Sequence, residues 1–447
     1  MLNAGASYYE FNIRDGIRDS VAAALLGARN SDSPTLPDNL EIRTGATVLR
    51  LLSNIASVTT RGDKPRIVGV EYIDRLERVR QVMLTRAGDQ DVDSSQVILA
   101  AGAIMTPQIL VNSGIGPHGR VVHLPGVGAN LQDHPVVAMS FRLAPNMTRK
   151  SSSMYTLGDE MEDYLISVAE LKSPGLNHNT TTTNLTKSMR KLLHGRIGAL
   201  GTPGFAAGAF LRSPWADDEA PDLQLTVFPR VVEPHVTGKE RQDEVNFQRD
   251  NCMLVTVALL RPDARYTIYF DKPEDIQSAS TSSNDAISAP TKSGGYETST
   301  KSQIARPSDF HLPSIDIPVD SDEYLSDSDV SRLSWGMEQV RRIVQTAPLS
   351  LQTEEEVYPG EGQNLREYIR ENHLPNSHWV GSTKMGTEND PMAVLDESLR
   401  VRGVIGLRVV DAGAIPAVPN GNTHSTVCVM ADRAVDLIVA ERETRQI

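Results

Sequence analysis

Alternation of apolar and polar residues marks three segments near the start of the chain as β-strands. They run over residues 40–52, 67–74 and 82–87, and turn residues separate them. β-branched residues, which fit the pleated and half-buried surface of a sheet, are frequent in these segments. This content and the turn residues between the segments predict a small antiparallel meander.

Three further apolar or alternating segments lie in the middle of the chain. DLQLTVFP (222–229) and CMLVTVALLRP (252–262) predict long strands, and ARYTIYF (264–270) alternates cleanly. Together they predict a second, larger sheet in a domain of its own. The stretch 273–308 is crowded with Ser and Thr and has few large apolar residues, so we expect a disordered surface insertion there.

Helical periodicity appears in four segments. The first, 14–27, is rich in Ala and Leu, and 327–344 and 364–372 follow later. For 327–344 we expect Asp329 or Ser331 as the N-cap. The last predicted helix, 425–443, carries apolar residues at helical spacing. These are Val427, Met430, Ala434, Leu437 and Ile438.

A strand, a tight turn and a helix follow one another at 97–112. The strand 97–101 meets Gly102 and Ala103, and we expect the helix to open at Thr106-Pro107, because Pro is well placed in a first helical turn. Glycine has no Cβ, so backbone there can approach a flat ligand closely. The free N–H groups of the following helix point back toward the turn and favour an anion.

Composition narrows the classes of partner. A chain of 447 residues suggests two or three domains, at roughly 100–200 residues each. The formal net charge of −13 argues against nucleic acid or an anionic membrane surface as the main partner. No run reaches the roughly 18 apolar residues of a membrane span. Cys252 and Cys428 both lie in apolar strings and are expected to be small core residues.

Several strings resemble the glucose–methanol–choline (GMC) family of flavoenzymes. They are AAGAIMTPQILVNSGIGP with its sequel LPGVGANLQDHP, then HWVGSTKMG, VVDAG and NGNTHSTV, in that order along the chain. The resemblance covers nearly the whole chain outside the Ser/Thr-rich insertion. It implies the cofactor FAD and an α/β (α+β) fold, in which a partial FAD-binding domain accompanies a substrate domain built on an antiparallel sheet flanked by helices.

The resemblance also assigns roles to residues. In this family a His before the Gly-(Thr or Ser)-x-x-Met-Gly string lies beside the flavin ring, which matches His378. A second residue opposite it matches Asn422, and His424 is the alternative. Asp133 and His134 resemble a structural turn. The residues expected along the cofactor are Val48, Gly102, Ala103, Asp411, Ala412, Asn422 and Thr423.

These residue types suit the oxidation of an alcohol. The flavin takes a hydride from carbon, and an imidazole with a pKa near neutrality can take the hydroxyl proton. A carboxamide N–H can donate to the developing alkoxide without a change of charge. We therefore expect His378 as the base and Asn422 as the orienting donor, acting on a small-molecule alcohol. His373 and His378 lack further ligands of suitable spacing, so no metal site is expected.

Comparison with the family pattern sets the expected domains. Family members begin with a strand, a Gly-x-Gly-x-x-Gly turn and a helix, and this sequence shows no such unit. We expect a partial FAD-binding domain from 1–135 and 395–447, and a substrate domain from 136–394. The start of the sequence shows no signal peptide, and any targeting segment would lie upstream of Met1.

Three other functions stay open. One is a hydroxynitrile lyase, in which the same histidine acts while the flavin is a spectator. Another is the light-driven decarboxylation of fatty acids known in an algal branch, which LGTPGFAAGAFLRS and APDLQLTVFPR resemble in context. That branch places a Cys and an Arg where this chain has Phe205 and Thr226, so a carboxylate would lack its bidentate partner. The third is a truncated paralogue without catalytic activity.

Overall fold

The computed structural model describes ten stretches of the chain, and they form two compact units. The described residues are 5–9, 13–14, 17–25, 37–54, 63–84, 95–144, 205, 207–231, 252–270 and 325–445. Unit 1 comprises Met1–Ile42, His134–Asp263 and Leu325–Asn376. Unit 2 comprises Arg43–Asp133, Ala264–Tyr324 and Ser377–Ile447. The predicted insertion at 273–308 lies outside the described residues.

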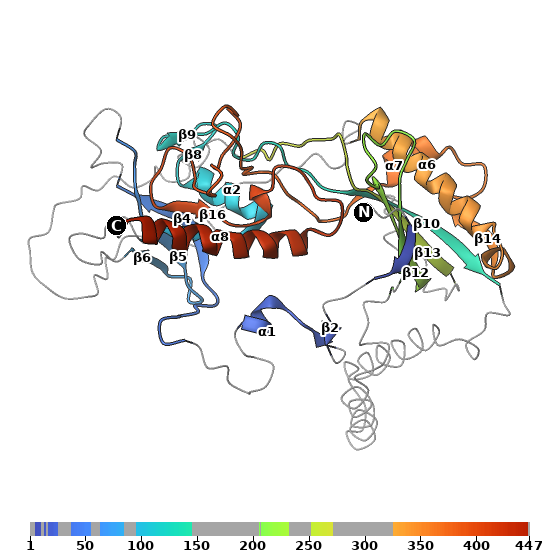
Figure 1. Ribbon diagram of the computed structural model, residues 1–447, viewed down its shortest axis with the longest axis horizontal. Coiled ribbons are helices and arrows are strands. Elements are labelled where there is room, and N and C mark those ends of the chain that lie inside the picture. Colours follow the sequence, from blue (N-terminus) through green and yellow to red (C-terminus); the bar gives the residue numbers. More distant parts are fainter. Residues whose placement is uncertain are drawn as a thin grey trace, which may run out of the picture. The chain divides into compact units, whose positions relative to one another are not determined.

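Unit 1 is built on a seven-stranded antiparallel sheet (Figure 1). Its strands, in spatial order, are β1 (Gly5–Tyr8), β11 (Ala207–Leu211), β12 (Leu223–Val231), β13 (Cys252–Leu259), β10 (Pro135–Leu143) and β14 (Thr353–Tyr358), and β15 (Leu374–Pro375) also pairs with β10. The two long strands predicted in the middle of the sequence are therefore confirmed as β12 and β13. Buried apolar side chains on β12 and β13 form the face against which a helix packs.

Helix α6 (Asp327–Val344) covers that face, and α7 (Leu365–Asn372) lies next to it (Figure 1). The close approach depends on Gly336, where a Cβ would lie 2.7 Å from Val257 Cγ1 of β13. The predicted N-cap was wrong. Ser326 caps the helix and accepts from the backbone N–H of Asp329, whose carboxylate accepts in return from the N–H of Ser326. This reciprocal capping box satisfies two donors at once, which neither predicted cap could do.

Unit 2 combines the predicted meander with short parallel pairs of strands. Its elements are β4 (Thr47–Ser53), β5 (Ile67–Ile73), β6 (Val79–Met83), β7 (Val97–Leu99), α2 (Gly102–Asn112), β8 (Ile115–Gly116), β9 (Val122–His123), β16 (Leu407–Val409) and α8 (Thr423–Arg445). Strands β4, β5 and β6 pair antiparallel in that order, which confirms the meander. Strand β7 pairs in parallel with β16, although the two strands are more than 300 residues apart in sequence. The end of β16 therefore lies beside the end of β7, which leads into α2.

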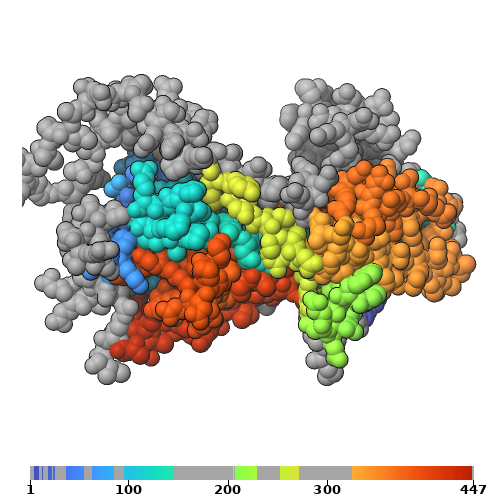
Figure 2. Space-filling model, turned by 90° about the horizontal axis from the view of Figure 1, so that it is seen from above, coloured from blue at the N-terminus to red at the C-terminus, as the bar shows by residue number. Residues whose placement is uncertain are grey.

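The core of unit 2 lies between α2, β7, β16 and α8. Leu99, Leu110, Val409 and Ala434 belong to one cluster of buried apolar residues. Helix α8 buries Ala434 and partly buries Met430, as the helical spacing predicts, and it runs along the surface of unit 2 (Figure 2). Cys252 is fully buried, as expected, whereas Cys428 is only half-buried, on a partly exposed flank of α8.

Two predicted elements differ in the structure. In place of one helix over 14–27, β2 (Ile13–Arg14) pairs with β3 (Ile17–Arg18), and among the residues described in this range only α1 (Val21–Leu25) is helical. A local hairpin satisfies these backbone groups, so helical propensity did not decide the conformation. Residues 264–270 keep the predicted alternation of buried and exposed side chains but join no sheet. Tyr266 and Ile268 bond instead to the loop at 128–131.

Among the described residues, Leu349–Leu351 (η4) and Ala412–Ala414 (η5) form short 3-10 helices. Within the part of the chain that the structure describes, no helix has the length and apolar character that crossing a membrane requires.

Candidate active site

His378 and Asn422 meet in unit 2. The Asn422 Nδ2 atom lies 3.0 Å from the His378 Nε2 atom, although the two residues are 44 positions apart in sequence. A carboxamide nitrogen only donates hydrogen bonds, so this contact requires an Nε2 atom without a proton. Burial lowers the pKa of the His378 imidazole below its ordinary value of 6.5. The pair is therefore poised with a neutral imidazole at neutral pH.

Asp133 holds the backbone that carries His378. Its Oδ1 atom accepts the backbone N–H of His378 at 2.7 Å, and its Oδ2 atom accepts that of Ser377 at 3.0 Å. The prediction of a structural role for Asp133 is consistent with these contacts. Its partner could not be read from the sequence, because the hydrogen bond spans 245 residues.

Asp411 joins the end of β16 to the start of α2. Its Oδ2 atom accepts from the Gly102 backbone N–H at 3.0 Å and from Thr106 Oγ1 at 2.6 Å, and its Oδ1 atom accepts from the Gly413 N–H at 2.8 Å. Burial raises the pKa of the Asp411 carboxyl above its usual value, while these donors oppose that rise. The structure thus brings Gly102, Asp411 and Ala412 of η5 together, with Asp411 occupied by protein donors.

Helix α2 begins earlier than predicted and includes Pro107 in its second turn. Proline lacks the N–H that would bond to the carbonyl four residues before it, which here is that of Ala103. The hydroxyl of Ser382 donates to this carbonyl instead. The prediction that Pro107 lies in the first turn was therefore wrong. Proline is tolerated in the second turn because the Ser382 hydroxyl, from a distant segment, replaces the hydrogen bond that proline cannot donate.

The start of α2 leaves open space beside its backbone. Gly102 has φ +86°, and a Cβ there would meet nothing within 4 Å, so the space beside this backbone is open. Ala101 makes no side-chain capping bond to the helix. A ligand can approach this backbone closely because Gly102 has no Cβ, but the Gly102 N–H itself already donates to the Asp411 carboxylate. Ala103 is buried at the same end of the helix.

The other expected cofactor residues occupy different places. Asn422 directly precedes α8, and Thr423 is its first residue. Val48 lies on β4 and pairs with Tyr72 of β5. The next residue along β4, Leu49, accepts a bond from Asn112 at the far end of α2. The structure therefore brings Val48 near the C-terminal end of that helix, and the Gly102 cluster lies at the other end.

His424 and the photodecarboxylase-like positions lie elsewhere. His424 is exposed, and its Nε2 atom is 3.7 Å from Cys428 Sγ one turn along α8. In unit 1, Phe205 packs edge-on against Tyr9, whose hydroxyl lies 3.1 Å from Thr226 Oγ1. Phe205 and Thr226 thus have Tyr9 as a common neighbour. The two positions that hold a Cys and an Arg in the algal branch therefore lie close together in this chain.

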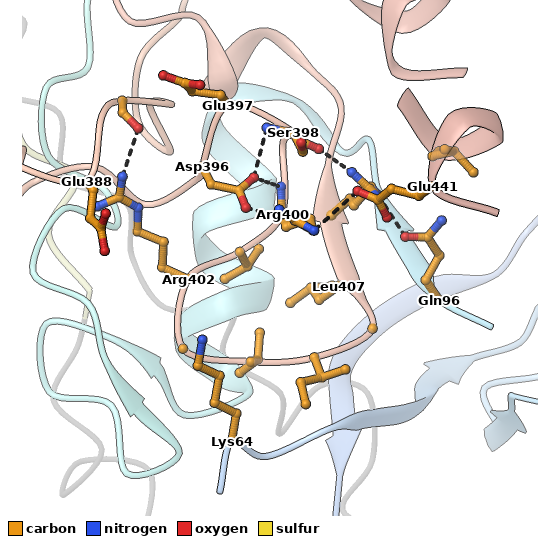
Figure 3. A pocket seen from close by; sticks show the side chains of 18 of the residues that line it. Lys64, Gln96, Glu388, Asp396, Glu397, Ser398, Arg400, Arg402, Leu407 and Glu441 are labelled. Carbon is orange, nitrogen blue, oxygen red and sulfur yellow. Dashed lines mark hydrogen bonds and ion pairs between the residues drawn. The ribbon is translucent and has the colours of Figure 1, made fainter. Parts of the chain in front are cut away.

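A separate concavity of about 1600 Å³ is lined by the segment around Arg400 (Figure 3). None of the expected site residues lines it. Its charged groups bond to one another: Arg400 Nε donates to Asp396 at 2.8 Å, and Arg408 donates to Glu441 at 2.5 Å. Arg402 donates to three backbone carbonyls. These contacts stabilise the turns before β16 and indicate a structural role.

Curated proteins of similar sequence are flavoenzymes. Glucose dehydrogenase [FAD, quinone] of Drosophila pseudoobscura pseudoobscura is 28% identical over 98% of this chain and 58% of its own length. The chloroplastic fatty acid photodecarboxylase of Chlamydomonas reinhardtii is 28% identical over 83% of this chain and 53% of its own length. The oxygen-dependent choline dehydrogenase of Vibrio vulnificus is 28% identical over 96% of this chain and 61% of its own length. The chain thus spans about 60% of the length of such relatives.

Among solved structures, pyridoxine 4-oxidase from Mesorbium loti matches with a TM-score of 0.61 at 20% sequence identity. The match covers 97% of this chain and 64% of that structure. The expected α/β (α+β) class is confirmed by this likeness together with the mixed helices and antiparallel sheet.

Family models match both ends of the chain. Two models, both described as GMC oxidoreductase, match residues 3–136 and 300–431. The matched ranges together cover more than half of the sequence. The second range includes His378, Asp411 and Asn422. The resemblance seen in the motifs is therefore confirmed, and the chain belongs to the GMC oxidoreductase family.

Proposed function

We propose that this chain carries the catalytic part of an FAD-dependent oxidoreductase acting on the CH–OH group of an alcohol. His378 is the base, and Asn422 orients the substrate oxygen. The division into a cofactor part (1–135 and 395–447) and a substrate part (136–394) belongs to the same proposal. Family membership and relatives named glucose dehydrogenase and choline dehydrogenase support it.

One observation carries the proposal: the 3.0 Å contact between Asn422 Nδ2 and His378 Nε2. The imidazole has a pKa lowered by burial, so it is neutral and able to accept a proton at pH 7. The Asn422 amide group reaches the same ring nitrogen. An alcohol hydroxyl that displaces the amide from this nitrogen would donate to Nε2 while its oxygen accepts from the amide, which aligns the proton for transfer.

The cofactor follows from the residues at the start of α2. Gly102 and Ala103 would lie along the cofactor, because the absence of a Cβ at Gly102 leaves space for it to approach the backbone closely. Ala412, Asn422 and Thr423 would lie along the remainder of the group, and Val48 at its adenine end. FAD, when bound, supplies the hydride acceptor that no protein side chain can provide. The carboxyl of Asp411 keeps the start of α2 in place through Gly102 and Thr106.

The first test is the visible absorption spectrum of the purified chain after incubation with FAD and gel filtration. We expect flavin bands to co-elute with the protein and to bleach anaerobically when choline or glucose is added as a probe. A protein that retains flavin but bleaches with none of a panel of primary and secondary alcohols would contradict the proposed reaction.

The second test removes the proposed base. His378→Ala should lower turnover by roughly 10²–10⁴-fold, the usual effect of losing a general base. His424→Ala is the matched control, because His424 is exposed near Asn422 and bonds to Cys428 rather than to His378. We expect the control to keep turnover within about threefold of wild type, a change below 1 kcal/mol in the barrier. Equal losses in the two variants would exclude His378 as the base.

Fatty acid photodecarboxylation is a second candidate, favoured by the similarity to the Chlamydomonas enzyme. Against it, Thr226 offers a hydroxyl already in contact with Tyr9, and a fatty carboxylate would need a bidentate cation. Release of carbon dioxide from palmitate under blue light, absent in the dark, would favour this candidate over alcohol oxidation.

A further inference from the structure

The segment Asn130–Asp133 bonds to both segments that carry the His378–Asn422 pair. Asp133 accepts the N–H groups of Ser377 and His378. It is fully buried, at 0% exposure. Ser377 has φ +61°, a left-handed conformation that costs a non-glycine residue free energy. Two hydrogen bonds to a buried carboxylate offset that cost and hold the peptide in the direction that sends His378 to Asn422.

Gln132 makes the matching contacts to the loop before Asn422. Its Nε2 atom donates to the Pro416 carbonyl at 3.0 Å, and its Oε1 atom accepts the Val418 N–H at 3.1 Å. Its backbone exchanges two hydrogen bonds, both of 3.0 Å, with Val380, two residues after His378. Gln132 is also fully buried, at 0% exposure. One side chain and its own backbone thus connect the two loops.

A close approach of the backbones confirms that these segments are tightly packed. Gly381 has φ +88°, and a Cβ there would lie 2.5 Å from the Asn130 carbonyl oxygen and 2.9 Å from Gln132 Nε2. Only glycine allows both the left-handed conformation and this approach. The segment at 378–381 therefore lies directly against Asn130 and Gln132.

We propose that Gln132 and Asp133 are positioning residues that together set the distance and orientation between His378 and Asn422. Asp133 bonds to the loop that carries His378, and Gln132 bonds to the loop that precedes Asn422. Both loops are thereby held by the same four-residue segment, Asn130–Asp133. The inference rests on the proposed function, because it assigns these two residues a role in that reaction. It extends beyond it, because the hydrogen bonds on which the role rests join these two side chains to the backbone of the two loops.

The physical need for such a segment is clear from the loops themselves. Neither His378 nor Asn422 lies within a helix or strand. A proton-transfer pair needs its atoms held to within about 0.5 Å, and a displacement of about 1 Å can lower a rate 10²-fold. Anchoring both loops to one buried segment removes their independent motion relative to each other.

The test replaces Asp133 by Asn in the full chain, with Asp222→Asn as the matched control. Asp222 is also fully buried and accepts two hydrogen bonds from Ser213, but it belongs to unit 1. The readout is the ¹⁵N spectrum of the His378 ring in histidine-labelled protein, assigned with His378→Gln. We expect Asp133→Asn to shift the ring from the single tautomer that accepts at Nε2 toward the mixture of a free imidazole. The control should leave the ring unchanged.

A second pair of variants keeps every charge and tests the same geometry if Asp133→Asn does not fold. The exposed residue Ser377 is replaced by Val, which strongly resists a positive φ, or by Gly, which adopts it freely. Ser377→Val should raise the His378 pKa toward 6.5 as the ring becomes more exposed, and Ser377→Gly should leave that pKa unchanged.

Kinetics separate positioning from binding. In an active preparation, Asp133→Asn and Ser377→Val should lower kcat about 10–100-fold with little change in KM, and the two control variants should not. Unchanged ring spectra and kcat in both Asp133→Asn and Ser377→Val would overturn the inference. Because the ring spectra need no substrate, they decide it even if the wild-type chain oxidises no alcohol, an outcome that would count only against the proposed function.

Discussion

Replacing Gly381 by alanine should destabilise unit 2 more than its conformation alone explains. The first cost is the left-handed backbone, with φ +88°. The second is the clash, since the new methyl group would lie 2.5 Å from the Asn130 carbonyl oxygen and 2.8 Å from Asn130 Nδ2. A left-handed alanine costs about 1–2 kcal/mol and overpacking about 1–3 kcal/mol, so we expect a total loss of about 2–5 kcal/mol.

Gly406→Ala is the matched control within the same unit. Gly406 has φ +77°, but a Cβ there would make only ordinary contacts, the nearest at 3.4 Å from the Ile67 carbonyl oxygen. The control therefore carries the conformational cost of about 1–2 kcal/mol and no clash. The difference between the two variants isolates the close approach of the 378–381 segment to Asn130.

Urea unfolding followed by tryptophan fluorescence measures this difference. Trp379, next to His378, is the single tryptophan in the segments of unit 2, and the other two are Trp215 and Trp335. Replacing those two by Phe in all chains makes the signal specific for unit 2. If Gly381→Ala and Gly406→Ala agree to within about 0.5 kcal/mol, the close packing of the two segments does not exist in solution and the reasoning fails.

Three further predictions concern buried polar groups and packing. Thr106→Val should lower the free energy of unfolding by about 1–3 kcal/mol in urea, because it removes a hydrogen bond to the buried Asp411 carboxyl. Thr383→Val should leave that free energy unchanged or raise it, because the buried Thr383 hydroxyl has no partner among the described residues. Because burial lowers the His378 pKa, folding excludes a proton, so the stability from this group is present above pH 6.5 and should fall as pH drops through the folded pKa; His378→Gln should abolish that part of the pH dependence. Gly336→Ala should lower the free energy of unfolding of unit 1 by about 1–3 kcal/mol, because its methyl group would lie 2.7 Å from Val257 of β13. The midpoint of urea unfolding should therefore move to a lower urea concentration, and an unchanged midpoint would contradict the packing of α6.

Local patterns were sufficient for much of the secondary structure. The meander of β4, β5 and β6 and the long helices α6 and α8 follow from periodicity, because their buried faces repeat along a continuous stretch of chain. Residues 264–270 show the limit of this reasoning. Their alternation correctly indicated one buried face, but the partner turned out to be a loop.

The sequence by itself also determined the family, since the motifs around His378, Asn422 and Asp411 identify it, and those motifs contain the residues that we propose for the chemistry. Only the tertiary structure decided how they meet. In the structure Asn422, and not His424, is the neighbour of His378. The Ser382 hydroxyl donates to the Ala103 carbonyl, which Pro107 leaves without its helical hydrogen bond. The reason is physical: each contact joins groups 44 to 279 residues apart. Periodicity and propensity describe near neighbours in the chain, whereas residues so far apart in sequence meet only in the folded chain.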